Sequence, residues 1–116
     1  MEKFFQLKVV KKAYKLALLV YKTTANFPSE EKFGITNQMR RASVSVGSDI
    51  AEGTKKKSVK ERIYFHEMAD TSLEELKFQI YLSYGLKYLA KEPTEELLKL
   101  AREVGRMLNS LNNSLK

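Results

Sequence analysis

The chain has 116 residues, a formal net charge of +7 at neutral pH, five glycines, two prolines and no cysteine. This length favours a single domain over residues 1–116, and the lack of cysteine excludes disulfides, thiolate nucleophiles and zinc–thiolate sites. A strongly basic small domain attracts nucleic acid or acidic proteins, although the same charge also serves solubility.

The hydropathy pattern indicates a protein without a membrane partner. The longest uninterrupted apolar run covers residues 16–21. That is far short of the roughly 20 residues needed to cross a bilayer. Lys8, Lys11 and Lys12 interrupt the N-terminal segment, which therefore lacks the apolar core of a signal peptide. These features predict a soluble, cytoplasmic chain.

The first predicted helix covers about residues 4–25. Its apolar residues recur at steps of three and four, which is typical of a helix packed in a bundle. The expected seam consists of Leu7, Val10, Tyr14, Ala17 and Tyr21, and a second set beside it consists of Phe5, Val9, Ala13, Leu16 and Val20. Such a wide apolar arc can contact two neighbours, inside the chain or in another subunit. Pro28 ends this segment because proline disfavours helix in the residue before it.

A short turn and a second helix follow. Ser29 can cap the turn through Glu30 and Glu31, and Thr36 is a second candidate cap. Two stripes at helical spacing then run towards Gly53. One is apolar, with Ile35, Met39, Ala42, Val46 and Ile50, and the other is polar, with Gln38, Arg41, Ser45, Asp49 and Glu52. This helix therefore has one face for a core and one for hydrogen bonds.

Two more helices complete the predicted fold. Ser58 and Glu61 match a capping box before a helix over about residues 59–88, and Pro93, with Thr94 as an alternative cap, marks the start of the last one. Their expected core stripes are Ala69, Leu73, Leu76, Ile80 and Ser83, and then Leu97, Ala101, Val104, Leu108, Leu111 and Leu115. Four amphipathic helices with short connections predict an all-α, up-down-up-down antiparallel four-helix bundle.

One stretch is more specific than helical periodicity requires. GITNQMRRASVSVGSDIAEG, residues 34–53, combines paired arginines, small residues and a closing Ala-Glu-Gly. AYKLALLVYKTTANFP precedes it, and YFHEMADTSLEELKFQIYLSYGLKYL and GRMLNSL follow it. Together these segments resemble the bacterial four-helix bundle family of intervening-sequence proteins of 23S ribosomal RNA, over nearly the whole chain.

The resemblance implies a fold and an assembly rather than a reaction. Members of the family are often encoded in segments inserted in ribosomal RNA genes, and the usual assembly is a homo-oligomeric ring of five. The chain is also similar to the accessory proteins of diversity-generating retroelements, basic pentameric bundles that bind a reverse transcriptase and nucleic acid. The family pattern usually has proline where this chain has Gly47 and asparagine where it has Asp49, so a flexible glycine would replace a proline kink.

Basic residues gather in two segments. Residues 1–28 carry six lysines against one glutamate, and residues 54–62 carry five basic side chains against one glutamate. In an up-down bundle the second connection lies at the same end as the start of the first helix, so Lys55–Lys57 are expected to join Lys3 and Lys8 in one basic end. The candidate nucleic-acid-binding residues are Lys55, Lys56, Lys57, Lys60, Arg62, Arg40, Lys8, Lys11, Lys12 and Lys15. A solvated loop and a solvated outer helix face are the alternatives.

The paired arginines have separate interpretations because successive helical residues point about 100° apart. Arg41 shares the polar stripe of Asp49 and Glu52, so we expect a structural ion pair with Glu52 or with an acid of the third helix. Phosphate binding is the alternative for Arg41. Arg40 is expected to be freer of such structural contacts.

No catalytic or metal-binding constellation is recognisable. His66 is the only histidine, and Ile63 stands where the Glu-x-x-His pattern of a di-iron bundle needs glutamate. Neither a Gly-rich phosphate loop nor a nucleophile elbow is present. We therefore predict a non-enzymatic homo-oligomer, without cofactor or metal, that binds RNA, DNA or a ribonucleoprotein through several lysine-rich patches. The alternative is a protein–protein scaffold that does not bind nucleic acid.

Overall fold

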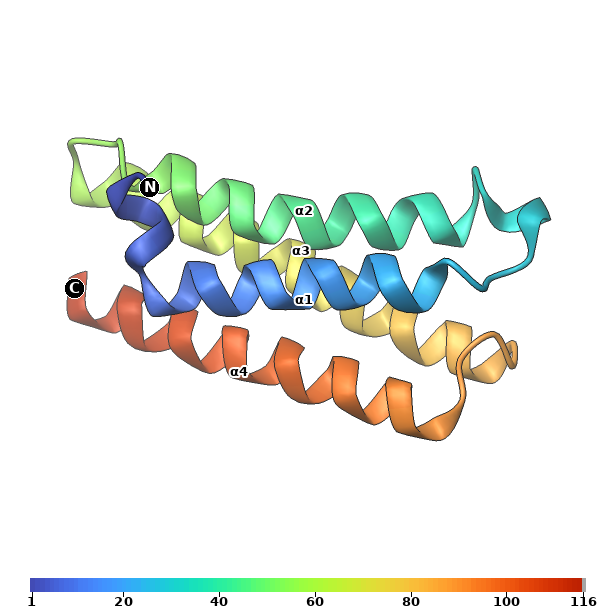
Figure 1. Cartoon of the computed structure of the whole chain (residues 1–116). Helices are drawn as coiled ribbons and strands as arrows, with labels where there is room; N and C mark the ends of the chain where they lie inside the picture. Colours follow the sequence, from blue (N-terminus) through green and yellow to red (C-terminus); the bar gives the residue numbers. More distant parts are fainter. Residues whose placement is uncertain (116) are drawn as a thin grey trace.

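The computed structural model describes residues 1–115 and consists of four long helices in a bundle (Figure 1). The helices are α1 (Lys8–Thr24), α2 (Ile35–Gly53), α3 (Val59–Gly85) and α4 (Lys91–Leu115), with short 3-10 helices η1 (Lys3–Gln6) and η2 (Ser29–Glu31). Successive helices run in opposite directions, and α4 closes the bundle against α1. The predicted all-α, up-down-up-down four-helix bundle is confirmed.

The core stripes predicted for the last three helices are confirmed except at the C-terminal end of α4. The buried residues include Met39, Val46 and Ile50 of α2, Leu73, Leu76 and Ile80 of α3, and Leu97, Ala101, Val104 and Leu108 of α4. Leu111 and Leu115 are only partly buried. Within the described residues, no helix combines the length and the hydropathy needed to cross a membrane.

Helix α1 buries a different stripe from the one expected as its seam. Val9, Ala13, Leu16 and Val20 of the second set fill the core together with Val10 of the expected seam, whereas Tyr14 and Tyr21 are 50% and 45% exposed. Both stripes are apolar, so periodicity alone cannot show which of them faces the core. The smaller side chains face the core because α2 lies close by, and the tyrosines keep their hydroxyl groups near water.

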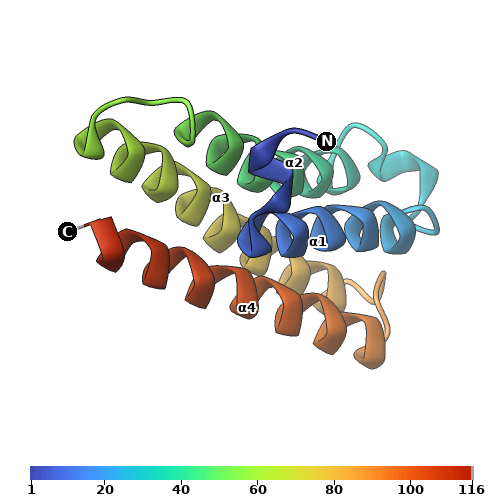
Figure 2. The ribbon, with the colours of Figure 1, turned by 60° about the vertical axis from the view of Figure 1, so that its left-hand side comes forward.

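The N-terminal segment does not continue α1 back to residue 4 as predicted. Leu7 is extended, with φ −68° and ψ 132°, and it separates η1 from α1. Figure 2 shows η1 lying across α1 and α2. Phe5 of η1 packs edge-on against Tyr14, with ring centroids 5.2 Å apart. The turn is therefore favoured because it covers apolar surface that a straight helix would leave in water.

Helix α2 is continuous through Gly47, where a kink could have been expected. The predicted short turn is confirmed as η2, but Ser29 does not cap it, because Pro28 holds the N-cap position and the Ser29 side chain makes no cap hydrogen bond. The cap of α2 is not Thr36, which is buried inside the helix; the backbone N–H of Ile35 instead donates to Oε1 of Glu31 at 3.4 Å. The break after Gly53 is confirmed.

Helix α3 begins as predicted and ends slightly earlier. The Ser58 hydroxyl accepts the backbone N–H of Glu61 at 3.1 Å, and it donates to the Glu61 carboxylate at 3.0 Å. At the other end Lys87 has a φ of 67°. The N–H of Tyr88 donates to the carbonyl of Ser83 at 2.9 Å, and the N–H of Lys87 donates to that of Tyr84 at 3.0 Å. These bonds form a Schellman motif in which lysine occupies the usual glycine position, so no glycine signalled the end.

Helix α4 begins at Lys91, with Pro93 in its first turn as predicted. The proline is tolerated because the first backbone N–H groups of a helix have no partner within it. Thr94 is not a cap, since its hydroxyl donates to the carbonyl of Ala90 at 2.8 Å.

We expect Lys87→Gly to raise the free energy of unfolding by about 1 kcal/mol, because glycine adopts positive φ without the clash of a Cβ atom. Urea denaturation followed by circular dichroism measures the change. The matched control is Lys99→Gly, at an exposed position inside α4, which should lose about 1 kcal/mol. Equal losses in both variants would contradict the assigned role of Lys87.

Candidate nucleic-acid interface

The bundle brings the start of the first basic segment and the whole of the second to one end. The α2–α3 connection, η1 and the start of α1 lie at the same end in Figure 1. Lys3 and Lys55 line one hollow of about 390 Å³, together with Glu2, Phe4, Leu7 and Thr54. The expected proximity of Lys3 to the lysine-rich connection is therefore confirmed.

Two basic residues of the connection have structural contacts. Nε of Arg62 donates to the carbonyl of Lys56 at 2.8 Å, and the Lys56 ammonium lies 5.0 Å from the centre of the Phe65 ring. Both side chains are partly buried, whereas Lys55, Lys57 and Lys60 are exposed. Arg62 and Lys56 thus shape the loop, and the other three present mobile ammonium groups to solvent.

The lysines of α1 also differ from one another. Lys8, Lys11 and Lys15 are exposed, but Nζ of Lys12 lies 2.9 Å from Oε2 of Glu103 on α4. The hydrogen bond from Lys12 lowers the pKa of Glu103 and so favours the charged form of this carboxylate. Lys12 therefore joins two helices, and because its charge is already paired with Glu103 it is less available to a ligand.

A basic residue that the sequence did not point to lies beside Lys8. Arg106 of α4 and Lys8 line the same hollow, with Leu7, Val9 and Met107. The two residues are far apart in sequence, and only the packing of α4 on α1 brings them together.

The structure reverses the roles expected for the paired arginines. Nε of Arg40 donates to Oγ1 of Thr24 at 2.9 Å, and its Nη2 donates to the carbonyl of Tyr21 at 3.4 Å. The guanidinium carbon also lies 4.6 Å from the centre of the Tyr21 ring. Arg40 thus binds the C-terminal turn of α1, where a positive charge is favourable, and joins α1 to α2.

Arg41, by contrast, is exposed, and none of the ion pairs formed within residues 1–115 includes it. The expected pair with Glu52 is absent for a geometric reason. A helix rises about 1.5 Å per residue, which separates Arg41 from Glu52 by roughly 16 Å. A shared stripe does not by itself bring two residues into contact.

Asp49 lies on the wall between α2 and α3, and none of the ion pairs among residues 1–115 includes it. It lines a hollow with Ser45, Tyr64 and Met68. Burial raises the pKa of Asp49, and the nearby Glu52 carboxylate raises it further. The expected network of Arg41, Asp49 and Glu52 is therefore not formed, and Glu52 acts on Asp49 only by disfavouring its charge.

His66 is buried between three helices. Its Nδ1 lies 2.8 Å from Oδ1 of Asn112 on α4, and the side chain is 4% exposed. A Cβ added at Gly53 of α2 would lie 3.6 Å from its Nε2. These contacts are those of a packed, hydrogen-bonded core residue.

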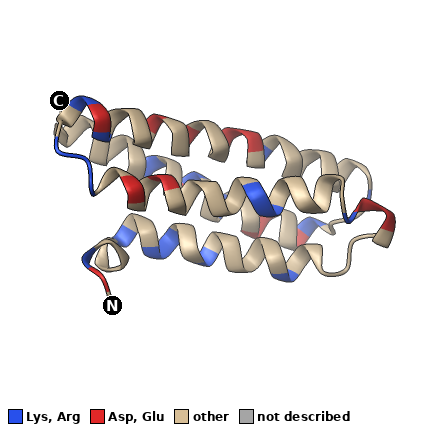
Figure 3. Cartoon of the chain, turned by 90° about the horizontal axis from the view of Figure 1, so that it is seen from above, with Lys and Arg blue, Asp and Glu red and all other residues tan. Residues whose placement is uncertain are grey.

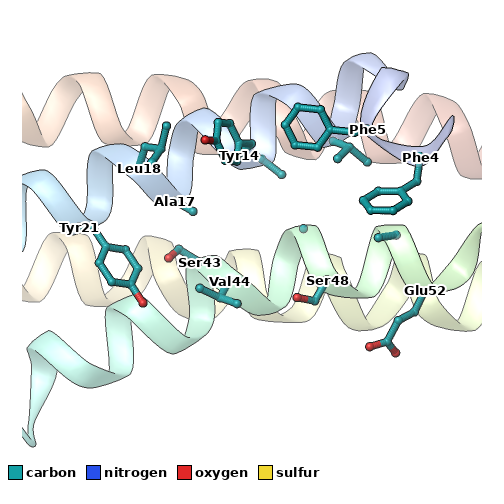
Figure 4. Close-up of a pocket in the computed structure, with 14 residues that line it drawn as sticks. Phe4, Phe5, Tyr14, Ala17, Leu18, Tyr21, Ser43, Val44, Ser48 and Glu52 are labelled. Atoms are coloured by element: carbon teal, nitrogen blue, oxygen red, sulfur yellow. The ribbon is translucent and has the colours of Figure 1, made fainter. Parts of the chain in front are cut away.

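A larger hollow than these lies elsewhere, along α1 and α2. This α1–α2 groove has a volume of about 650 Å³, and Figure 4 shows the side chains of Phe4, Tyr21 and Val44 around it. Its other lining residues are Phe5, Val10, Ala13, Tyr14, Ala17, Leu18, Ser43, Gly47, Ser48, Ala51 and Glu52. The sequence signal for it was the wide apolar arc of α1.

We expect Asp49→Asn to raise the melting temperature at pH 7, because asparagine removes the charge that burial and Glu52 disfavour. A raised pKa means that the folded chain holds the proton of Asp49 more tightly than the unfolded chain does. The free energy of unfolding therefore falls as pH rises from the pKa of Asp49 in the unfolded chain to its higher pKa in the folded chain. The gain should therefore shrink towards pH 3. Thermal unfolding at both pH values, with Asp70→Asn as an exposed control, measures it. A lower melting temperature at pH 7 would contradict the assignment.

Comparisons with known proteins agree with the fold. Residues 5–110 match the family described as 23S rRNA-intervening sequence protein. A crystal structure from Bacteroides thetaiotaomicron, of a protein with unknown function from the S23 ribosomal protein family, superposes with a TM-score of 0.81 at 22% identity, covering 90% of this chain and 97% of that chain. No curated protein is significantly similar in sequence. Because the family match spans most of its length, the chain belongs to the 23S rRNA-intervening sequence protein family.

Proposed function

We propose that this chain is a non-enzymatic, cytoplasmic adaptor that forms a homo-oligomer and binds RNA, or a ribonucleoprotein, through its basic ends. The observation that supports the proposal most is the gathering of Lys3, Lys55, Lys57 and Lys60 at one end of the bundle, where all four are exposed. A ring of five, which the family resemblance implies, would present five such ends together.

The mechanism is electrostatic. Lysine ammonium groups attract phosphates without reading bases, and each neutralised phosphate releases counterions, so binding weakens steeply with salt. Lys8, Lys11 and Lys15 extend the basic surface from the end along α1 (Figure 3). One subunit offers only weak contacts, and a fixed array of subunits multiplies them into useful affinity.

A protein–protein scaffold without nucleic-acid binding is the second candidate. The apolar α1–α2 groove supports it, because exposed apolar surface of this kind commonly marks a protein contact. An acidic protein would then be the partner of the lysine-rich end.

Replacing Lys55, Lys57 and Lys60 together by Ala should weaken the binding of a labelled structured RNA. The slope of log K against log salt should fall by about one for each phosphate contact that is lost. Fluorescence anisotropy at several salt concentrations measures both the affinity for the RNA and this slope. The control triple replaces Lys22, Lys32 and Lys91, which lie at the opposite end, and changes the net charge equally.

Equal weakening in both triples would show that total charge, and not the basic end, governs binding. RNA binding that does not depend on salt would contradict the electrostatic mechanism. No RNA binding at physiological salt, with one acidic protein recovered from a nuclease-treated lysate, would favour the scaffold.

A further inference from the structure

Helix α3 and its C-cap residue Leu86 carry a second apolar stripe that the core does not use. Its members, which we call the α3 ridge, are between 37% and 68% exposed: Tyr64, Met68, Phe78, Leu82 and Leu86. Tyr64 and Met68 line one hollow against α2, and the other three line a second hollow against α2. The ridge therefore follows one side of α3, next to α2. A helix that is apolar on two sides is normally covered on both.

The α1–α2 groove has the complementary shape. Small residues, Ala13, Ala17, Gly47, Ser48 and Ala51, are part of its lining. Leu18, which also lines it, is 53% exposed. A groove with small lining residues admits large side chains, and the α3 ridge consists of such side chains. Groove and ridge lie on either side of α2, so one copy cannot fill its own groove.

Charge favours docking between unlike faces. Helix α1 carries five lysines and no acid, whereas α3 carries five acids against three basic residues. The acids are Glu61, Glu67, Asp70, Glu74 and Glu75, and the basic residues are Lys60, Arg62 and Lys77. Figure 3 looks down on α2, with the blue of α1 along one side and the red of α3 along the other. Groove against groove would bring two lysine-rich helices together, and ridge against ridge would bring two acidic ones together. Groove against ridge pairs opposite charges.

Contacts within one subunit show which residues of α1 and α3 are level with one another. Adjacent residues of α2 contact both neighbours: Arg40 binds Thr24 of α1, and Sδ of Met39 lies 3.3 Å from Oγ of Ser83 on α3. Thr24 and Ser83 are therefore at about the same level along the bundle. Because α1 and α3 run in the same direction, Leu18 is level with Phe78.

We propose that the α3 ridge of one copy docks into the α1–α2 groove of a second copy, with parallel bundle axes and Phe78 beside Leu18. In this register Lys15 is level with Glu74. The proposal rests on the self-association in the proposed function and adds which surfaces meet. Since groove and ridge lie on adjoining faces, each docked copy is turned relative to the last, and repeated docking curves instead of forming a straight stack.

The first test measures the molecular mass in solution by light scattering. Leu18→Glu and Phe78→Glu each place a charge in the proposed contact, and each should reduce the assembly to the 13.4 kDa single chain. Tyr81→Glu is the matched control, because Tyr81 is also 53% exposed on α3 but faces α4, where it accepts a hydrogen bond from Arg102. Its mass should stay that of the wild type.

Failure of this inference is distinguishable from failure of the proposed function. A wild-type chain that is monomeric would overturn both. A wild-type oligomer whose mass survives Leu18→Glu and Phe78→Glu would overturn only the assigned surfaces and leave the groove to another partner.

A second test uses the lack of native cysteine. A chain with both Leu18→Cys and Phe78→Cys should form a ladder of covalently linked copies after oxidation. Either single variant should remain unlinked on a denaturing gel, as should the control with Leu18→Cys and Tyr81→Cys. Linked dimers of the Leu18→Cys variant alone would show that groove meets groove, and would overturn the proposal.

Discussion

The close approach of α2 to its neighbours is the constraint on which the rest of the structure depends. Side chains on α2 are small where it meets α1 and α3: a Cβ at Gly47 would lie 3.7 Å from that of Ala13, and one at Gly53 only 3.1 Å from that of Phe65. Small contacts let the apolar stripes interlock in one core. The same closeness turns Tyr14 and Tyr21 of α1 outward, and so creates the groove beside α2.

The chain uses part of its positive charge to hold itself together. Arg40, Arg62 and Lys12 each bind a carbonyl, hydroxyl or carboxylate on another segment. The arginines suit this role because their planar groups donate in several fixed directions. Flexible lysines at the end of the bundle keep their charge in solvent. The formal net charge therefore overstates the number of basic side chains that are available to bind a phosphate.

The two kinds of surface lie in different places. Lys3, Lys55, Lys57 and Lys60 form an exposed cluster at one end, whereas the α1–α2 groove and the α3 ridge run along the sides of the bundle. Docking along the sides would leave the ends uncovered and bring them next to one another. In the proposed assembly, apolar contacts would thus set the geometry and lysines would supply the affinity.

Periodicity, punctuation and up-down connectivity were enough to predict the four helices, the core stripes of α2, α3 and most of α4, and the proximity of Lys3 to the lysine-rich α2–α3 connection. The sequence did not show which apolar stripe of α1 is buried, nor which of Arg40 and Arg41 makes structural contacts. Periodicity gives the direction of a side chain around its own helix, but not which neighbour approaches or at what level. Tertiary packing decided those, by setting small α2 residues against α1 and Arg40 beside Thr24.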